Sequence, residues 1–313
     1  MRRILAAGLL AALTLTACGG GSATTEPADS PAGSPAASGA AAGNADRSYD
    51  VSGIQQVDEI AALLPAAVAD KGTLVVGAAI DYPPAEFRAE DLQTAIGYDV
   101  DMSKALGRVL GLETETSAAE FASLLPGIGT KYDVGISSFT ITEERMASYN
   151  MISYITVGSS YAVRSGNPEG FDPDNICGQT IGVQTGTWQE EDLAAKSEQC
   201  VADGNEAIDV LSYGTQSDVT TNVIGGKAIA YYADSTVADY ASAQTGGQME
   251  VIGGVLDAAP QGIVVAQADA ELTEAVQAAM QYLMDEGIWT EILTSWGVDP
   301  DAALNTAELN PEV

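Results

Sequence analysis

Residues 132–145 read Tyr-Asp-Val-Gly-Ile-Ser-Ser-Phe-Thr-Ile-Thr-Glu-Glu-Arg, an apolar run followed by hydroxyl residues and an acidic helix start. The run from Tyr132 to Ser137 predicts a strand, and either Thr142 or the segment Thr140–Glu143 opens a helix after it. Because open α/β sheets bind ligands at the carboxyl ends of their strands, this junction predicts a binding site.

The same alternation of apolar runs and helices extends from Val57 to Ala303. Helical spacing of apolar residues predicts one helix from Asp99, as its cap, to Gly111, and another from Ala270 to just before Gly287. Alternating strands and helices are typical of an α/β protein with largely parallel sheets, and strands without polar alternation are typically covered on both faces. The other predicted strands are Thr73–Ala79, Thr180–Gln184, Ala207–Leu211, Ile229–Ala233 and Gly262–Ala266.

The composition excludes several classes of protein. The 313 residues include 12 Lys and Arg against 44 Asp and Glu, a net charge of -32, and no histidine. Without histidine there is no Ser-His-Asp triad, no Cys-His pair and no His-ligated zinc. A charge this negative repels nucleic acid, so we expect no nucleic-acid partner, and the excess of acid mainly indicates a soluble surface.

The N-terminal residues predict export and a lipid anchor. Two arginines precede an apolar core over residues 4–15, which is shorter than the roughly 20 residues that cross a bilayer. Residues 1–17 are therefore predicted to be a signal peptide. The string Leu-Thr-Ala-Cys ending at Cys18 resembles a bacterial lipobox, whose cysteine is lipidated, although a plain cleavage site is the alternative. The Gly-, Ala-, Ser- and Pro-rich residues 18–56 predict a lipid-anchored flexible tether.

The other two cysteines are Cys177 and Cys200. In an exported chain they lie where disulfides persist, so we expect them to pair. Closing this loop would stabilise the fold by roughly 3 kcal/mol. Two free buried thiols are the alternative.

Three strand-to-helix junctions carry candidate ligand-binding residues. Arg145 falls in a first helical turn, where the helix dipole favours acids, so a ligand anion and an ion pair with a neighbouring carboxylate explain it equally well. Thr187 and Glu190 form a capping box suited to a carboxylate or phosphate. Asp234 follows a strand and fits either a ligand contact or an ordinary helix N-cap.

Two acidic pairs resemble metal ligands at first sight. Asp99 and Asp101 lack the remainder of a calcium-binding loop, and Asp299 and Asp301 flank Pro300 as turn residues do. We therefore predict neither a metal nor a cofactor.

Short strings along the chain form an ordered set. They are Lys71–Gly77, Tyr82–Pro84, Gly97–Asp101, Leu125–Pro126, Lys131–Asp133, Thr140–Arg145, Cys177–Gly178, Gly186–Thr187, Asp285–Gly287 and Trp296–Gly297. Together they resemble the amino-acid-binding branch of the bacterial solute-binding proteins, family 3, the receptors of ABC importers. The resemblance covers Val57 to Val298 and is greatest to the actinobacterial lipoproteins of that family.

The resemblance implies a two-lobed, periplasmic-binding-protein-like (type II) α/β fold. Its two hinge crossings would lie near Ser159–Ala162 and Ala258–Ile263. The lobes would close on one free amino acid and deliver it unchanged to an ABC permease and its ATPase, so the protein would not be an enzyme. The implied parts are lobe 1 over residues 57–160 and 259–304, lobe 2 over residues 161–258, and a C-terminal tail over residues 305–313.

The resemblance also implies the groups that hold the amino acid backbone. Arg145 falls where the family's arginine binds the α-carboxylate through its two-pronged guanidinium. Asp234 falls where an aspartate takes the α-ammonium. Ser138 and Thr140 fall in the segment that adds hydroxyl and backbone contacts.

Four further residues match the groups that close around the ligand. Thr187 and Trp188 match the helix start that covers the carboxylate, and Tyr82 and Phe121 match the aromatic pair beside the ligand side chain. Members that take cationic or amide side chains often carry aspartate where this chain has Ala79, so a lysine, arginine or histidine ligand is not expected, and a polar or neutral ligand is expected rather than a cationic one. Trp188 would either stack on the ligand or restrict the pocket.

Two other functions stay open at this point. An enzyme of the same fold, similar to cyclohexadienyl or arogenate dehydratases, is one, and an amino-acid-sensing lipoprotein is the other. In each case the chain is expected to be a monomer at the outer face of the cell membrane, held there by the lipid anchor only.

Overall fold

The computed structural model describes residues 47–313. The predicted signal peptide, the lipidation site Cys18 and the tether as far as residue 46 lie outside the described residues. Within the described range, no helix is long and apolar enough to cross a membrane.

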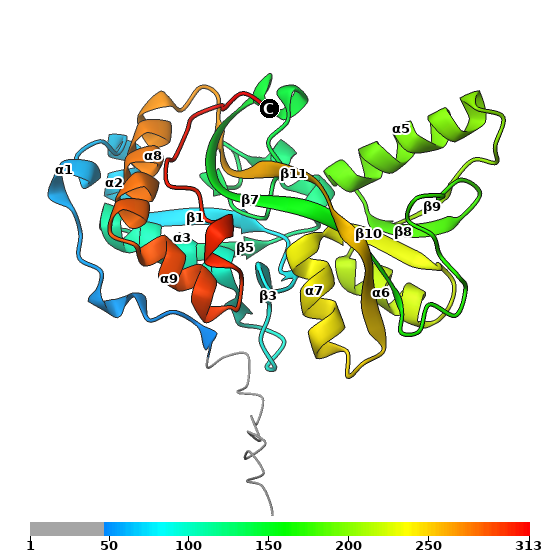
Figure 1. The fold of residues 1–313 in the computed structure, drawn as a ribbon. Coiled ribbons are helices and arrows are strands. Elements are labelled where there is room, and N and C mark those ends of the chain that lie inside the picture. The colour runs from blue at the N-terminus through cyan, green and yellow to red at the C-terminus, as the bar shows by residue number, and fades with distance from the viewer. Residues whose placement is uncertain (1–46) are drawn as a thin grey trace, which may run out of the picture. The chain divides into compact units, whose positions relative to one another are not determined.

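An eight-stranded sheet in the order β5-β1-β6-β11-β7-β10-β8-β9 organises the described chain (Figure 1). Strands β5, β1 and β6 pair in parallel at one end of the sheet, and β10, β8 and β9 pair in parallel at the other. We call these ends, with the elements packed on them, the β1 side and the β8 side. The strands are β1 (Thr73–Ala78), β5 (Glu113–Ala118), β6 (Val134–Gly135), β7 (Tyr149–Arg164), β8 (Thr180–Gln184), β9 (Asp209–Tyr213), β10 (Ala230–Asp234) and β11 (Met249–Ala266).

Strands β7 and β11 run between the two sides and pair with each other in antiparallel fashion (Figure 1). β11 also pairs with β6 on the β1 side, and β7 pairs with β10 on the β8 side. The ladder between β7 and β11 is irregular between Ile252 and Leu256, between Leu256 and Ala259, and between Gln261 and Gly262. The segments 159–162 and 258–263, where hinges are expected, therefore lie inside these two strands.

Helices and a small second sheet cover the large sheet. A three-stranded sheet and α3, α8 and α9 belong to the β1 side, whereas α5, α6 and α7 belong to the β8 side (Figure 1). The elements are α1 (Asp58–Ala61), α2 (Ala66–Lys71), β2 (Asp81–Tyr82), β3 (Glu86–Arg88), β4 (Ala95–Ile96), α3 (Tyr98–Leu110), α4 (Glu143–Met146), α5 (Trp188–Ala202), α6 (Gln216–Ile224), α7 (Ser235–Gln244), α8 (Ala270–Asp285) and α9 (Ile288–Ser295).

Each side has its own apolar core. On the β1 side, α3, α8 and α9 pack around Trp289, whose ring meets Tyr98 and Tyr154 edge-on and whose indole N–H donates to the carbonyl of Tyr154 at 2.7 Å. On the β8 side, Tyr161 and Tyr232 stack at 4.5 Å between ring centroids. These cores fix the strand ends from which the site is built.

Several predicted elements differ from the structure. Strand β8 has the predicted bounds, but β9 and β10 begin two and one residues later than predicted, β6 is shorter, and β11 begins at Met249 rather than Gly262. Helix α3 begins at Tyr98 with Gly97 as its N-cap, so the prediction that Asp99 caps it is wrong. Asp99 is instead the second residue of the helix. Its side chain points into the protein, where it accepts hydrogen bonds from Ser138 and Tyr154 and does not cap the helix.

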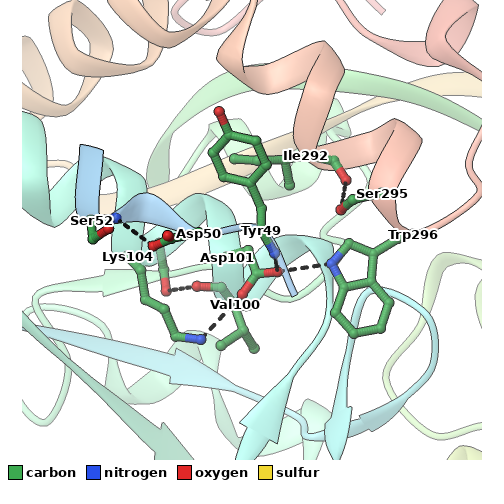
Figure 2. A network of polar contacts seen from close by, with 10 residues as sticks. Tyr49, Asp50, Ser52, Val100, Asp101, Lys104, Ile292, Ser295 and Trp296 are labelled. Carbon is green, nitrogen blue, oxygen red and sulfur yellow. Dashed lines mark hydrogen bonds and ion pairs between the residues drawn. The ribbon is translucent and has the colours of Figure 1, made fainter. Parts of the chain in front are cut away.

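The N-terminal residues 47–56 lie against the β1 side, although composition predicts them as tether (Figure 2). The backbone N–H of Tyr49 donates to Oδ2 of Asp101 at 2.8 Å, and the indole N–H of Trp296 donates to the same oxygen at 2.9 Å. The Tyr49 hydroxyl donates to Glu291 at 2.7 Å. Packed residues are therefore found before the predicted boundary at Val57, because a buried carboxylate holds this segment.

The C-terminal segment 305–313 is also packed rather than free. The backbone N–H of Asn310 donates to the carbonyl of Met151 at 2.8 Å, and the Asn310 side chain accepts from the Met151 N–H at 2.8 Å. Ala307 is buried. The predicted tail thus extends the packing of β7.

The predicted disulfide is confirmed. Cys177, in the loop before β8, is joined to Cys200 of α5, with 5.6 Å between the two Cα atoms. The bond fastens the start of one β8-side strand to the helix that follows it.

Candidate ligand-binding site

One cavity lies between the β1 side and the β8 side, with about 240 Å³ of space that no atom fills. This space includes some that is open to solvent, and the residues around it come from both sides. All the residues predicted from the sequence to bind ligand line it, together with Ser137, Gln184 and Gln189. The predicted ones are Tyr82, Phe121, Ser138, Thr140, Arg145, Thr187, Trp188 and Asp234.

Arg145 lies in the single turn of α4, which Thr142 caps by accepting a hydrogen bond from the Arg145 backbone N–H at 3.2 Å. The guanidinium donates to the carbonyl of Thr140 at 2.8 Å and to the carbonyl of Gly186, across the cavity, at 3.2 Å. Its Cζ is 6.0 Å from the centre of the Phe121 ring. The side chain thus bridges the two sides through neutral acceptors.

The charge of Arg145 has no close counter-ion. The residue is 7% exposed, and within residues 47–313 it forms no ion pair, so the alternative of a carboxylate partner does not hold. Burial lowers the pKa of the guanidinium, against the opposing effect of Glu191 and Asp234, yet an arginine stays charged. A buried charge without a partner is costly, so this position favours an incoming anion.

Asp234 ends β10 and is 4% exposed. Its Oδ1 accepts from the amide of Gln189 at 2.7 Å and its Oδ2 from the amide of Gln261 at 2.6 Å. Asp234 occupies the N-cap position of α7, as one interpretation of the sequence expects, but its side chain makes no capping bond to the helix and is directed to the glutamines instead. Burial raises the pKa of Asp234 to about 6, although Gln261, Gln189 and Arg145 lower it. The group is a buried acceptor suited to a ligand cation.

The start of α5 closes the β8 side of the cavity. Thr187 caps the helix by accepting from the Glu190 N–H at 3.2 Å, while the Glu190 carboxylate accepts from the Gly186 N–H at 2.7 Å. Gly186 has φ +83°, and a Cβ built on it would lie 2.9 Å from the Cβ of Ala122 on the β1 side. Glycine is therefore required here because the two sides approach so closely.

The three aromatic residues of the cavity, Phe121, Tyr82 and Trp188, make different contacts. Phe121 stacks on Phe139 with 5.0 Å between ring centroids, which fixes it as one wall. The hydroxyl of Tyr82 reaches across to accept from the backbone N–H of Asp234 at 3.1 Å. Trp188, the first residue of α5, lines the opposite wall and is partly buried.

Sequence reasoning missed four residues of the site. Ser137, Gln184 and Gln189 line the cavity, and Gln261 holds Asp234 from β11. Ser137 and Gln184 end predicted strands, so the rule that named their neighbours applied to them as well. Gln261 has no local signal, because only the fold brings its side chain to Asp234 at the carboxyl end of β10.

The acidic pairs weighed as metal ligands have other roles. Asp101 holds the N-terminal segment, and Asp299 accepts from the Asp301 N–H at 3.0 Å, as the turn interpretation requires. Among residues 47–313, no cluster of three or more His, Cys, Asp or Glu side chains is arranged to hold a metal ion.

Comparison with known proteins finds chains that are similar to this one in sequence and in fold. The arginine-binding protein ArgT of Corynebacterium glutamicum is 37% identical over 261 residues, which are 81% of this chain and 85% of the relative. The L-cystine-binding protein TcyJ of Escherichia coli is 26% identical over 73% of this chain and 84% of its own. A crystal structure of a mutant of ArgBP from T. maritima is similar with a TM-score of 0.67 and 29% identity, over 74% of this chain and 97% of the other.

The fold and the family follow from these similarities. The similar structures are two-lobed, and this chain has the same two-lobed α/β fold. The relatives are solute-binding proteins, so this protein is not an enzyme and the dehydratase alternative is set aside. The model of one family matches residues 74–299. The chain therefore belongs to the bacterial extracellular solute-binding proteins, family 3.

Proposed function

We propose that this protein captures a free amino acid between its lobes and delivers it to the permease of an ABC importer. One observation carries the proposal: a buried guanidinium, Arg145, and a buried carboxylate, Asp234, line the same small cavity, and neither is in an ion pair with another residue of 47–313. An α-carboxylate and an α-ammonium would neutralise both charges at once. Relatives named for arginine and cystine support an amino acid as the ligand.

Lobe closure is the proposed mechanism. We assign residues 57–160 and 259–304 to lobe 1 and residues 161–258 to lobe 2. The cavity is lined from both lobes, so a ligand that contacts both favours the closed form over the open one. Flexing at the irregular pairing of β7 and β11 would then let the lobes separate.

For the ligand side chain we propose a polar or neutral group in preference to a cationic one. The reason is Ala79, which stands where members that take cationic or amide side chains often carry an aspartate. The relative ArgT is named for arginine, so arginine and its neutral analogue citrulline make the deciding pair. Citrulline should bind at least as tightly as arginine in calorimetric titrations, and a clear preference for arginine would reverse this assignment.

We propose that Cys18 carries the lipid that holds the protein at the outer face of the membrane, as a monomer. The mass of the N-terminal peptide from protein isolated from membranes tests the lipid, with Cys18→Ala as the unmodified control. Loss of amino acid uptake when the gene is deleted would support transport rather than sensing.

The proposal is tested directly by replacing Arg145, the residue proposed to bind the α-carboxylate, and measuring the affinity for the ligand. Arg145→Ala should weaken binding about 30-fold to several-thousand-fold, because a buried charged partner is worth about 2 to 5 kcal/mol. Arg145→Lys keeps the charge but loses the two-pronged geometry and should lie between. Arg108→Ala, an exposed arginine of α3, is the control. A thermal-shift screen of the twenty amino acids selects the ligand, and wild-type affinity in Arg145→Ala would refute the assignment.

A further inference from the structure

Two buried carboxyl groups lie behind the serine wall of the cavity. Glu86 of β3 and Asp99 of α3 are each 1% exposed. Neither lines the cavity, and within residues 47–313 neither forms an ion pair with Lys or Arg. Since buried acids without cations are costly, their presence here requires an explanation from their contacts.

Each carboxyl group holds one of the two wall serines. The Ser137 hydroxyl donates to Oε1 of Glu86 at 2.6 Å and accepts from the backbone N–H of Ala79 at 3.0 Å. The backbone N–H of Ser138 donates to Oδ2 of Asp99 at 2.9 Å, and the hydroxyl of Tyr154 donates to the same oxygen at 3.0 Å. One oxygen of each acid is thus committed to the wall.

Within residues 47–313, the second oxygen of each carboxyl group lacks a hydrogen-bond donor. Oε2 of Glu86 and Oδ1 of Asp99 are buried, and among the described residues neither finds a donor while both acids are ionised. Glu86 and Asp99 are neighbours, because the charge of Asp99 raises the pKa of Glu86 and a hydrogen bond with Glu86 opposes the rise that burial causes in the pKa of Asp99. A single proton on Glu86, donated to Asp99, satisfies both oxygens and leaves one negative charge instead of two.

The electrostatic surroundings favour that shared proton. Burial, and then the charge of Asp99, raise the pKa of Glu86 well above its ordinary value. The other titratable groups facing the pair are Asp81 of β2, Asp234 of β10, and the tyrosines Tyr82 of β2, Tyr98 of α3 and Tyr154 of β7. None of these is a cation, so nothing among them favours a second negative charge.

Ser138 needs the support. Its φ is +50°, in the left-handed region that a serine rarely adopts. The bond from its N–H to Asp99 holds the backbone in this conformation at the point where Ser138 lines the cavity. A loss of that bond would allow the wall to relax away from the ligand.

We propose that Glu86 and Asp99, sharing one proton, are positioning residues that fix Ser137 and Ser138 in the geometry that binds the ligand. This inference rests on the proposed function for its binding readout. The shared proton can be tested without any ligand.

The first test is the pH dependence of stability. The folded chain keeps a proton on Glu86 above about pH 4, where an unfolded Glu loses it. The folded state therefore binds more protons, and this contribution to stability is lost as pH rises towards the folded pKa. Glu86→Gln keeps a donor to Asp99 and has no proton to lose. Its melting temperature should match wild type near pH 4 and exceed it by about 2 °C or more at pH 9.

The control and the contradicting result are direct. Glu113→Gln, an exposed acid of β5, should follow the wild-type curve. Parallel curves for wild type and Glu86→Gln from pH 4 to 9 would overturn the shared proton, whatever the ligand proves to be.

The second test is binding, with arginine and citrulline as the probes. Glu86→Ala should bind whichever probe the wild type binds about 10-fold more weakly, equivalent to about 1.4 kcal/mol. Glu86→Gln should restore the affinity, which a role in packing alone would not require. Equal affinity in wild type, Glu86→Ala and Glu86→Gln would refute positioning. If wild type binds neither probe, the binding test passes to the amino acid with the largest thermal shift in the screen, and absence of any shift contradicts the proposed function instead.

Discussion

Oδ2 of Asp81 accepts a hydrogen bond of 2.8 Å from the backbone N–H of Gln216. Asp81 belongs to β2 on the β1 side, and Gln216 is the first residue of α6 on the β8 side. Neither lines the ligand cavity, so the bond joins the lobes outside it. The carboxylate also lies at the positive end of a helix, which favours its charge.

Asp81→Asn should change how stability depends on pH. Burial raises the pKa of Asp81 to about 6, against the bonds from Gln216 and Gln184 that lower it. The folded state therefore binds more protons than the unfolded state between about pH 4 and 6, and the contribution of Asp81 to stability falls as pH rises through that window. Asparagine does not titrate, so its contribution to stability does not fall with pH. The free energy of unfolding of the variant, relative to that of wild type, should therefore rise by up to about 3 kcal/mol between pH 4 and 7.

Thermal unfolding of both proteins from pH 4 to 8 measures this gain. Asp70→Asn, an exposed aspartate of α2, is the matched control. A difference between Asp81→Asn and wild type that does not change with pH would contradict the prediction.

Asp234→Asn should weaken amino acid binding about 30-fold to several-thousand-fold, because it removes the charge that faces the ligand ammonium. Analogues that lack the ammonium should lose less. Since the pKa of free Asp234 is about 6, wild-type affinity should fall as pH drops below that value, whereas the variant should show no such fall. Calorimetric titrations between pH 5 and 8 check both points, and a variant with the wild-type pH profile would exclude Asp234 as the ammonium contact.

Gly186→Ala should prevent full closure. The new methyl would lie 2.9 Å from Cβ of Ala122, in the opposite lobe. A smaller closed population lowers the apparent affinity in proportion, and we expect a loss of about 10-fold or more. X-ray scattering of the protein with saturating amino acid should show a larger radius than wild type.

Gly204→Ala provides the control for backbone strain. Gly204 has φ +82°, close to the +83° of Gly186, but no atom lies within 4 Å of its added Cβ. Both variants should lose about 1 to 2 kcal/mol of stability from the left-handed backbone. An equal loss of affinity in the two would show that strain, and not contact between the lobes, is responsible.

Replacing Cys177 and Cys200 together by serine should lower the stability by about 3 kcal/mol. The cross-link lies on the β8 side, and neither cysteine lines the cavity, so the affinity of the folded variant should be unchanged. Denaturant unfolding measures the loss, and wild type in a reducing agent should reproduce it. A variant as stable as wild type would mean that the loop is fixed by its other contacts.

The sequence predicts the buried strands of this fold better than its edges. β8 is apolar and covered on both faces, so composition alone locates it. β5 reads Glu-Thr-Glu-Thr-Ser-Ala and is an edge strand with exposed residues, so no apolar run indicates it. The first twelve residues of β11 are also largely unburied, which is why only its last part was predicted.

The candidate site shows the same division. The residues predicted to contact the ligand stand at strand ends or helix starts, where local sequence and family resemblance both apply. Glu86, Asp99 and Gln261 act through other residues, and their partners are distant in the chain: Glu86 meets Ser137, and Gln261 meets Asp234. Contacts of that kind arise from topology, so no local pattern could indicate them.

The fastening of Tyr49 to Asp101 and Glu291 has a mechanical consequence. Both partners belong to helices of the β1 side, so any load applied through Tyr49 is borne by that side. If the protein is attached to a surface by its N-terminal end, the β1 side stays fixed relative to that surface, and the β8 side moves when the protein closes on its ligand. A fluorophore on α5 would then report ligand capture as a displacement relative to the surface.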